Sequence, residues 1–276
     1  MTTATPKLQK GAVAEALATV NELETGIHAF DLGQYKKAIE ILKNSEIESA
    51  YLKIPPRLTP KVIEALQVAQ PAYRKHFHAV KTTRIIAGIL RINRKLSHFA
   101  QNETWADEMH VAAVLCQFRV SGFFGYKFFQ SLLKGTGIKE ESFNLIREFL
   151  FGIPVMRKLT FKKNGDIGKW KLDVYAFLEK LATSPEASKL IFCAIEFNTL
   201  YHLKRELEKM NKDIWDDSFL PRAEQLWYYG KIVDIMNESP PEEGLSEMLR
   251  EFRSVSMDIF RMGEEEKSQP VSVPHP

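Results

Sequence analysis

Apolar residues between Lys81 and Ala100 recur at the spacing of an α-helix. At about 100° per residue they fall on one narrow arc, while basic residues fall on the adjoining arc. The apolar arc consists of Ile85, Ile89, Ile92, Leu96 and Phe99. The basic arc consists of Arg84, Arg91, Arg94, Lys95 and His98. Since a helix of about 20 residues is about 30 Å long, the basic arc predicts a ridge that follows several phosphates.

The longer segment from Ala65 to Ala100 contains no Asp or Glu. Its bases are Arg74, Lys75, Lys81, Arg84, Arg91, Arg94 and Lys95. The whole chain holds 38 Lys and Arg against 35 Asp and Glu, so this excess is local. It predicts an anion-binding surface, with nucleic acid as the first candidate. The alternative is a solvated basic face on a core helix, although such faces usually mix charges of both signs.

Helical periodicity extends through nearly the whole chain of 276 residues, which predicts an all-α protein with two lobes. The expected divisions are a mobile arm (1–11), an N-terminal lobe (12–134), a C-terminal lobe (138–238), and a linker, amphipathic helix and disordered acidic tail (239–276). The hinge is expected at Gly135–Gly137. Later helices are expected at Glu141–Phe151, Trp170–Ala182, Glu186–Met210 and Pro221–Asn237.

Asn164-Gly165 is a turn signal, so a short β-hairpin or an exposed basic loop is expected near residues 157–170. Lys162 and Lys163 give this segment a second basic patch. Upstream, the aromatic run Phe123–Phe129 lies among basic residues. Such a run could stack nucleobases, but it is more often part of a core.

The formal net charge of +3 is unevenly distributed. From Pro240 onward there are eight acids and four bases, so this tail carries −4 and residues 1–239 carry +7. A basic body suits a polyanion-binding protein, and an acidic tail could compete for the same surface. A disordered, solubilising tail is the other interpretation.

An apolar stripe in the tail predicts an amphipathic helix at Leu245–Met262, after the link Glu238–Pro241. The stripe residues proposed to mediate oligomerisation are Leu245, Met248, Leu249, Phe252, Val255 and Ile259. The stripe needs burial, and docking on a neighbouring protomer would give a homo-oligomer. The alternative is that the helix packs on its own chain.

No sequence motif indicates catalysis. The chain has no nucleophile elbow, Walker loop, dinucleotide fingerprint or zincin motif, so we expect a non-enzymatic protein without cofactor or metal. Glu103, Asp107 and His110 share a helical face that could hold a divalent ion. The two acids are equally well explained by their place in the first turn of a helix, where the dipole favours negative charge.

Cys116 and Cys193 lie in apolar runs, which predicts buried thiols in a reducing compartment. The first residues lack the apolar region of a signal peptide, and no apolar run approaches the length of a membrane span. The sequence therefore predicts a cytoplasmic protein.

The segment Lys81–Leu90 (KTTRIIAGIL) resembles a short helical segment in the nucleoproteins of segmented negative-strand RNA viruses, the bunyavirus-type nucleoproteins. Phe30–Lys43 is similar to an upstream segment of the same group, and together the two cover about 25 residues. The resemblance implies a two-lobed α-helical protein with a basic cleft for single-stranded RNA. It also implies a terminal arm that links protomers, and location in the virion.

Two functions from different classes are therefore expected. The first is a nucleoprotein that coats single-stranded RNA without sequence preference, with Arg84, Arg91, Arg94 and Lys95 on phosphates and Lys162 and Lys163 closing over the strand. The second is a helical adaptor or scaffold that binds a protein partner or an acidic membrane surface through the same patch.

Overall fold

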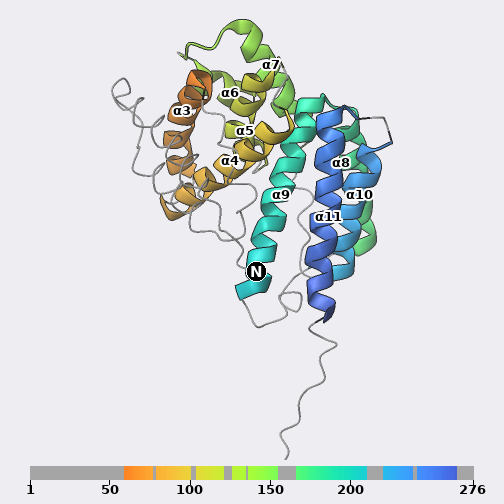
Figure 1. Cartoon of the computed structure of the whole chain (residues 1–276). Coiled ribbons are helices and arrows are strands. Elements are labelled where there is room, and N and C mark those ends of the chain that lie inside the picture. The colour runs from red at the N-terminus through yellow and green to blue at the C-terminus, as the bar shows by residue number, and fades with distance from the viewer. Residues whose placement is uncertain are drawn as a thin grey trace, which may run out of the picture.

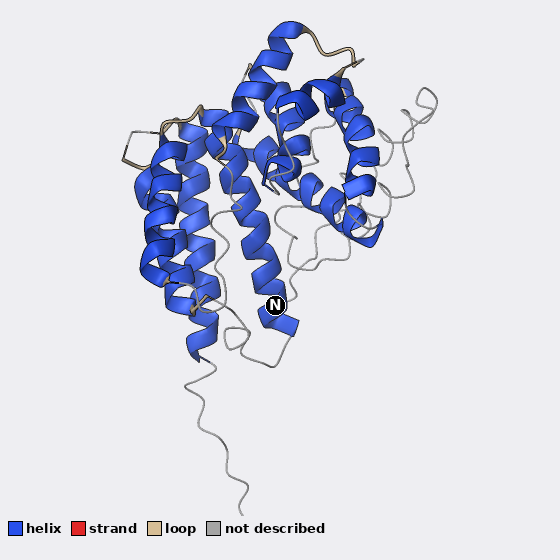
Figure 2. Cartoon of the chain, turned by 180° about the vertical axis from the view of Figure 1, so that it is seen from behind, coloured by secondary structure: helices blue, strands red, loops and turns tan. Residues whose placement is uncertain are grey.

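A computed structural model of the chain describes residues 59–76, 79–100, 104–120, 126–134, 136–154, 166–209, 220–238 and 241–265. Within these ranges it contains nine α-helices and no strand, which confirms the predicted all-α class there (Figure 2). With the labels of Figure 1, the helices are α3 (Pro60–His76), α4 (Ala79–Phe99), α5 (Ala106–Val120), α6 (Tyr126–Leu133), α7 (Glu140–Gly152), α8 (Ile167–Ala182), α9 (Glu186–Lys209), α10 (Arg222–Met236) and α11 (Glu243–Glu265).

Helix starts follow local sequence signals. Pro60 occupies the first position of α3, where its missing N–H is not needed, and the Ile63 amide donates to the Thr59 carbonyl oxygen at 3.0 Å. The Asp166 carboxylate caps α8 by accepting a hydrogen bond from the Lys169 amide at 3.1 Å. Capping of this kind satisfies amides that have no partner within the helix.

Helix α9 passes through the middle of the molecule, between two groups of helices (Figures 1 and 2). Helices α3 to α7 lie on one side, and α8, α10 and α11 lie on the other. Helices α4 and α5 pack on α9 from the first side and α11 packs on it from the second. One hydrophobic core contains buried residues of all nine helices.

The predicted lobe boundaries and the hinge at Gly135–Gly137 stay a prediction. Helix α7, the first helix of the predicted C-terminal lobe, packs closely on α5 of the predicted N-terminal lobe. Of the expected β-hairpin, residues 155–165 lie outside the described ranges, and residues 167–170 already form the first turn of α8. The expected arm at 1–11 and the helices before Thr59 also lie outside these ranges.

The end of α7 is tied to the start of α9 by two serines. The Ser184 hydroxyl donates to the Gly152 carbonyl oxygen at 2.7 Å, and the Ser188 hydroxyl donates to the Phe149 carbonyl oxygen at 2.8 Å. A Cβ atom at Gly152 would collide with the Ser188 side chain, so a larger residue here would force the Ser188 contact to shift.

Helix α11 buries its apolar stripe within its own chain. Leu245, Met248, Leu249, Phe252 and Ile259 are at most 1% exposed, and Val255 packs against the same core. In the structure, α11 therefore packs on its own chain, which was the alternative to docking on a neighbouring protomer. Oligomerisation through these six residues would require α11 to exchange between chains, and a homo-oligomer stays a prediction.

The aromatic run belongs to the core as far as it is described. Phe129 is fully buried and Phe128 packs against the core, whereas the Tyr126 ring is 43% exposed. The side chains of Phe128 and Phe129 therefore face the interior and do not form a surface for stacking.

Candidate functional site

The basic residues of the predicted ridge are described to different extents. Arg91, Arg94 and Lys95 of α4 have described side chains. Arg74 and Lys75 in α3 and Lys81 and Arg84 in α4 have helical backbone, but their side chains lie outside the described part of the chain, as do all atoms of Lys162 and Lys163. The structure thus describes the side chains of the ridge only at its C-terminal part.

That part of the ridge is buried, which corrects the expected exposure. Arg91, Arg94 and Lys95 are 8%, 7% and 8% exposed. Their helix packs on α3, α5, α9 and α11, so neighbouring helices cover more than its apolar arc. We call Arg91, Arg94 and Lys95 the α4 cation cluster.

Arg91 joins α4 to α9 through polar and aromatic contacts. Its Nε donates to the Asn198 Oδ1 at 2.7 Å, its Nη2 lies 3.1 Å from the His202 Nε2, and its guanidinium lies 5.0 Å from the centre of the Tyr201 ring. A guanidinium has donors only, so the His202 Nε2 is the acceptor in this contact.

Lys95 joins α4 to both α9 and α11. Its Nζ lies 2.6 Å from the Glu251 Oε1 and 4.0 Å from the centre of the Phe197 ring. Burial raises the pKa of the Glu251 carboxyl to about 7, and the Lys95 ammonium opposes this effect because it favours the carboxylate. At the same junction, Gly244 of α11 lies directly against the Phe99 carbonyl oxygen at the end of α4.

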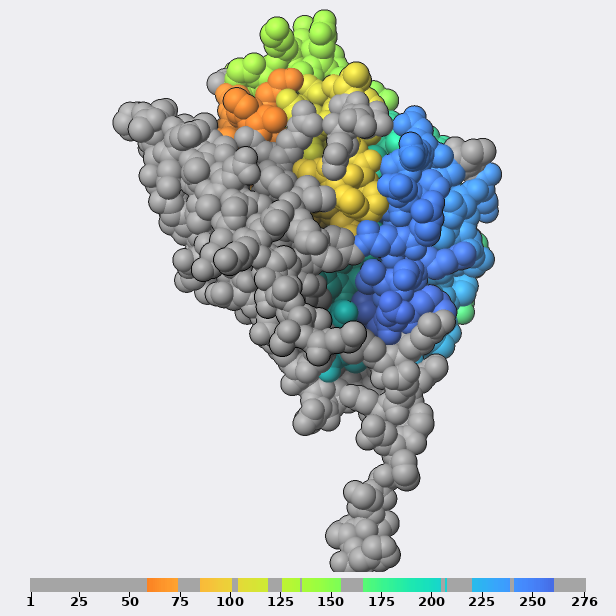
Figure 3. Space-filling model, in the orientation of Figure 1, coloured from red at the N-terminus to blue at the C-terminus, as the bar shows by residue number. Residues whose placement is uncertain are grey.

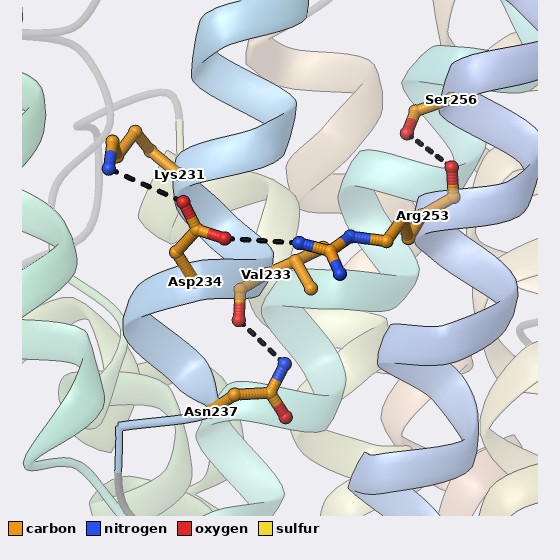
Figure 4. Close-up of polar contacts among 6 residues, drawn as sticks. All are labelled: Lys231, Val233, Asp234, Asn237, Arg253 and Ser256. Carbon is orange, nitrogen blue, oxygen red and sulfur yellow. Dashed lines mark hydrogen bonds and ion pairs between the residues drawn. The ribbon is translucent and has the colours of Figure 1, made fainter.

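Helix α11 also contacts α10 through a surface network (Figure 4). The Asp234 carboxylate accepts from the Arg253 Nη2 at 3.1 Å and from the Lys231 Nζ at 3.3 Å. The Asn237 amide caps a carbonyl oxygen of its own helix, that of Val233, at 2.8 Å. Among these exposed contacts, the pair between Arg253 and Asp234 joins α11 to α10, and Lys95 of the α4 cation cluster contacts α11 at Glu251.

Glu196 is a buried carboxyl that the sequence predictions missed. It is 3% exposed on α9 and accepts a hydrogen bond from the Tyr228 hydroxyl of α10. Burial raises its pKa to about 7, although the hydrogen bond from Tyr228 acts in the opposite direction. A lone acid within the apolar run Leu190–Leu200 was the available signal.

Glu108 is a second buried carboxyl, and it joins three helices. It accepts from the Lys61 Nζ of α3 at 2.7 Å and from the Ser142 hydroxyl of α7 at 2.6 Å. Burial alone would raise the pKa of Glu108, but the hydrogen bonds from Lys61 and Ser142 lower it below the ordinary value. Short contacts from both Lys61 and Ser142 are typical of a carboxylate that holds helices together.

The metal alternative receives no support from the described residues, where no three metal-ligating side chains lie together. His110 is fully buried, and its Nδ1 lies 2.6 Å from the Asn93 Oδ1. Glu103 lies outside the described ranges. The two cysteines are buried, and burial raises the pKa of the Cys116 thiol to about 12.

Comparison with known proteins gives no match to any family model, curated protein or solved structure. The resemblance to viral nucleoproteins therefore stays a prediction. Among the helices that the structure describes, none has the length and apolar character needed to cross a membrane.

Proposed function

We propose that this protein binds single-stranded RNA without sequence preference, and that the α4 cation cluster supplies phosphate contacts. The observation that carries the proposal is that Arg91, Arg94 and Lys95 share one arc of α4, on which Arg91 meets α9 and Lys95 meets both α9 and α11. The net charge of +7 on residues 1–239 adds a long-range attraction for a polyanion.

The chemistry of the cluster suits phosphate. A guanidinium matches two phosphate oxygens with parallel N–H donors, and an ammonium acts as a compact charge. Phosphate contacts carry no base information, so binding through them is independent of sequence. Coating of the strand by several copies belongs to the same proposal.

Access to the cluster requires an exchange of partners, because its side chains are buried. Two of the groups that Arg91 contacts, the Asn198 amide and the Tyr201 ring, carry no charge. Moving Arg91 to a phosphate would replace a neutral acceptor, the Asn198 Oδ1, by an anionic one, so that both partners of the hydrogen bond are charged.

The test is RNA binding by fluorescence anisotropy at several salt concentrations. The double variant Arg91→Gln, Arg94→Gln keeps polar side chains and removes two charges. We expect weaker binding to all sequences and a log–log salt slope shallower by about 0.7 for each phosphate that the variant no longer neutralises.

A matched control is Lys169→Gln, Lys180→Gln, which removes two charges from exposed positions of α8. We expect it to change the slope little. Equal slopes for the wild type and the α4 variant, with helicity intact in far-UV circular dichroism, would contradict the proposed site.

The second candidate is a helical adaptor that binds a protein or an acidic membrane surface. It is favoured by the burial and existing partners of the α4 cluster, which also suit cations that only hold helices together. An exposed apolar side chain, Leu172 of α8 at 70%, offers a contact for a protein partner. Purified protein with 260 nm absorbance that high salt removes would favour RNA, and its absence would favour the adaptor.

A further inference from the structure

The Glu251 carboxylate forms an ion pair with Lys95, which is a residue of the proposed phosphate site. The Lys95 side chain is 9% exposed and the Glu251 side chain is 26% exposed, so the carboxylate lies on the solvent side of the pair. The cation comes from α4 and the carboxylate from α11, 156 positions apart in the sequence. In the space-filling view, α11 lies at the surface beside the segment that contains α4 and α5 (Figure 3).

We infer that the Glu251 carboxylate holds, within its own chain, the position that an RNA phosphate takes on Lys95, and that it competes with RNA for this cation. The inference rests on the proposed function and adds a regulating residue to the same site. It makes Glu251 a local competitor whose removal strengthens RNA binding.

Exchange at Lys95 needs a side-chain movement and leaves the backbone of α11 in place. The neighbouring residues Leu249 and Phe252 are at most 1% exposed and anchor this turn of the helix in the core. Glu251 points from the same turn toward a partly solvated edge, so rotation about its side-chain bonds can release the carboxylate to water. No unfolding of α11 is required.

Exchange also avoids leaving a buried charge without an anion. Removing the anion of a partly buried ion pair is unfavourable, because the cation loses one of its partners. A carboxylate and a phosphate both offer oxygens to an ammonium, so replacement of one by the other conserves the pairing of Lys95. The contact between the Lys95 Nζ and the Phe197 ring, at 4.0 Å, can persist throughout.

Helix α11 provides a matched control for charge. Glu247 lies one turn before Glu251 on the same helix and is exposed. At pH 8, above the raised pKa of Glu251, both substitutions, Glu247→Gln and Glu251→Gln, remove a carboxylate from nearly the same place, and of the two only Glu251 has its carboxylate on Lys95. A difference between the two variants therefore reports the ion pair and not the net charge.

The experiment measures the affinity of the full chain for a single-stranded RNA oligonucleotide by fluorescence anisotropy. We expect Glu251→Gln to raise the affinity by about two- to fivefold, the range for removal of a partly exposed ion pair, and Glu247→Gln to raise it less. In a Lys95→Gln background, we expect Glu251→Gln to raise the affinity no more than Glu247→Gln does. Far-UV circular dichroism checks that each variant is folded.

Glu251→Asp gives a second variant, which keeps the charge but withdraws the carboxylate by one methylene. Its affinity should lie between those of the wild type and Glu251→Gln. Equal increases for Glu247→Gln and Glu251→Gln, or an increase that persists without Lys95, would overturn the competition while leaving RNA binding intact. Absence of salt-dependent binding in every variant would instead overturn the proposed function and the inference with it.

Discussion

Four of the buried charged side chains that the structure describes join different helices. Arg91 bonds across α4 and α9, Lys95 across α4 and α11, Glu108 across α5, α3 and α7, and Glu196 across α9 and α10. A buried charge is tolerated when hydrogen bonds and opposite charges replace its hydration. Of these four, only Glu196 stands out in the sequence as a lone charge in an apolar run, and the partners of all four lie on other helices.

Glu196 makes the stability of the protein depend on pH. Its carboxyl pKa is raised from 4.5 to about 7 in the folded state, so the folded protein binds more protons than the unfolded chain between these values. The free energy of unfolding should therefore fall as the pH rises from about 4.5 to about 7. The contribution of this one group is on the order of 3 kcal/mol.

Glu196→Gln keeps an oxygen that accepts from the Tyr228 hydroxyl and removes the titration. Urea denaturation between pH 5 and pH 8 should give a flatter profile for this variant than for the wild type. Glu179→Gln, at an exposed position of α8, should keep the wild-type profile. Identical pH profiles for wild type and Glu196→Gln would show that Glu196 does not titrate in this range.

At the scale of helices, the sequence predicted well where several helices begin and end. It predicted poorly how much of a helix surface neighbouring helices cover. The expected helices Glu141–Phe151, Glu186–Met210 and Leu245–Met262 correspond to α7, α9 and α11 within about three residues. Proline, glycine and capping signals are local, so they are visible in one sequence. How many neighbours cover a helix depends on distant segments, and this explains why the α4 cation cluster was expected at the surface.

The junction of α11 with α4 tests this packing through two glycines. A Cβ atom at Gly244 would collide with the backbone carbonyl oxygen of Phe99, whereas a Cβ atom at Gly230 of α10 would meet nothing within 4 Å. Gly244→Ala should lower the free energy of unfolding by about 1–3 kcal/mol, as overpacking does. Gly230→Ala should raise it by about 0.4–1 kcal/mol, because alanine loses less backbone entropy on folding.

Both changes are measured by urea denaturation monitored by circular dichroism. Both variants replace glycine by alanine within a helix, so the change in helix propensity is similar in the two. The opposite expected changes in the free energy of unfolding therefore report the packing at each site. If both alanine variants gained stability equally, α11 would not pack against the end of α4 as the structure has it.

For the whole molecule, the position of α11 decides whether the C-terminal segment stabilises the chain or links chains. Five residues of its stripe are at most 1% exposed within the chain. At about 1.5–3 kcal/mol for each buried apolar side chain, burial of these five contributes on the order of 10 kcal/mol before the entropy cost of ordering the helix. Truncation to residues 1–242 should therefore strongly lower the urea midpoint or abolish folding.

Truncation to residues 1–265 is the control, because it keeps all of α11. We expect it to match the full chain in urea denaturation. Sedimentation velocity would give the assembly state of each form. If residues 1–242 formed a stable monomer while the full chain was an oligomer, the result would support docking of α11 on a neighbouring protomer.

The two serine contacts between α7 and α9 have a topological consequence. Gly152 and Ser184 are hydrogen-bonded, so the stretch 153–183 begins and ends at nearly the same point of the molecule. The entropy of closing such a loop grows only slowly with its length. Evolution or an engineer could therefore lengthen the connection before α8, or graft a domain into it, without pulling apart the helices on either side.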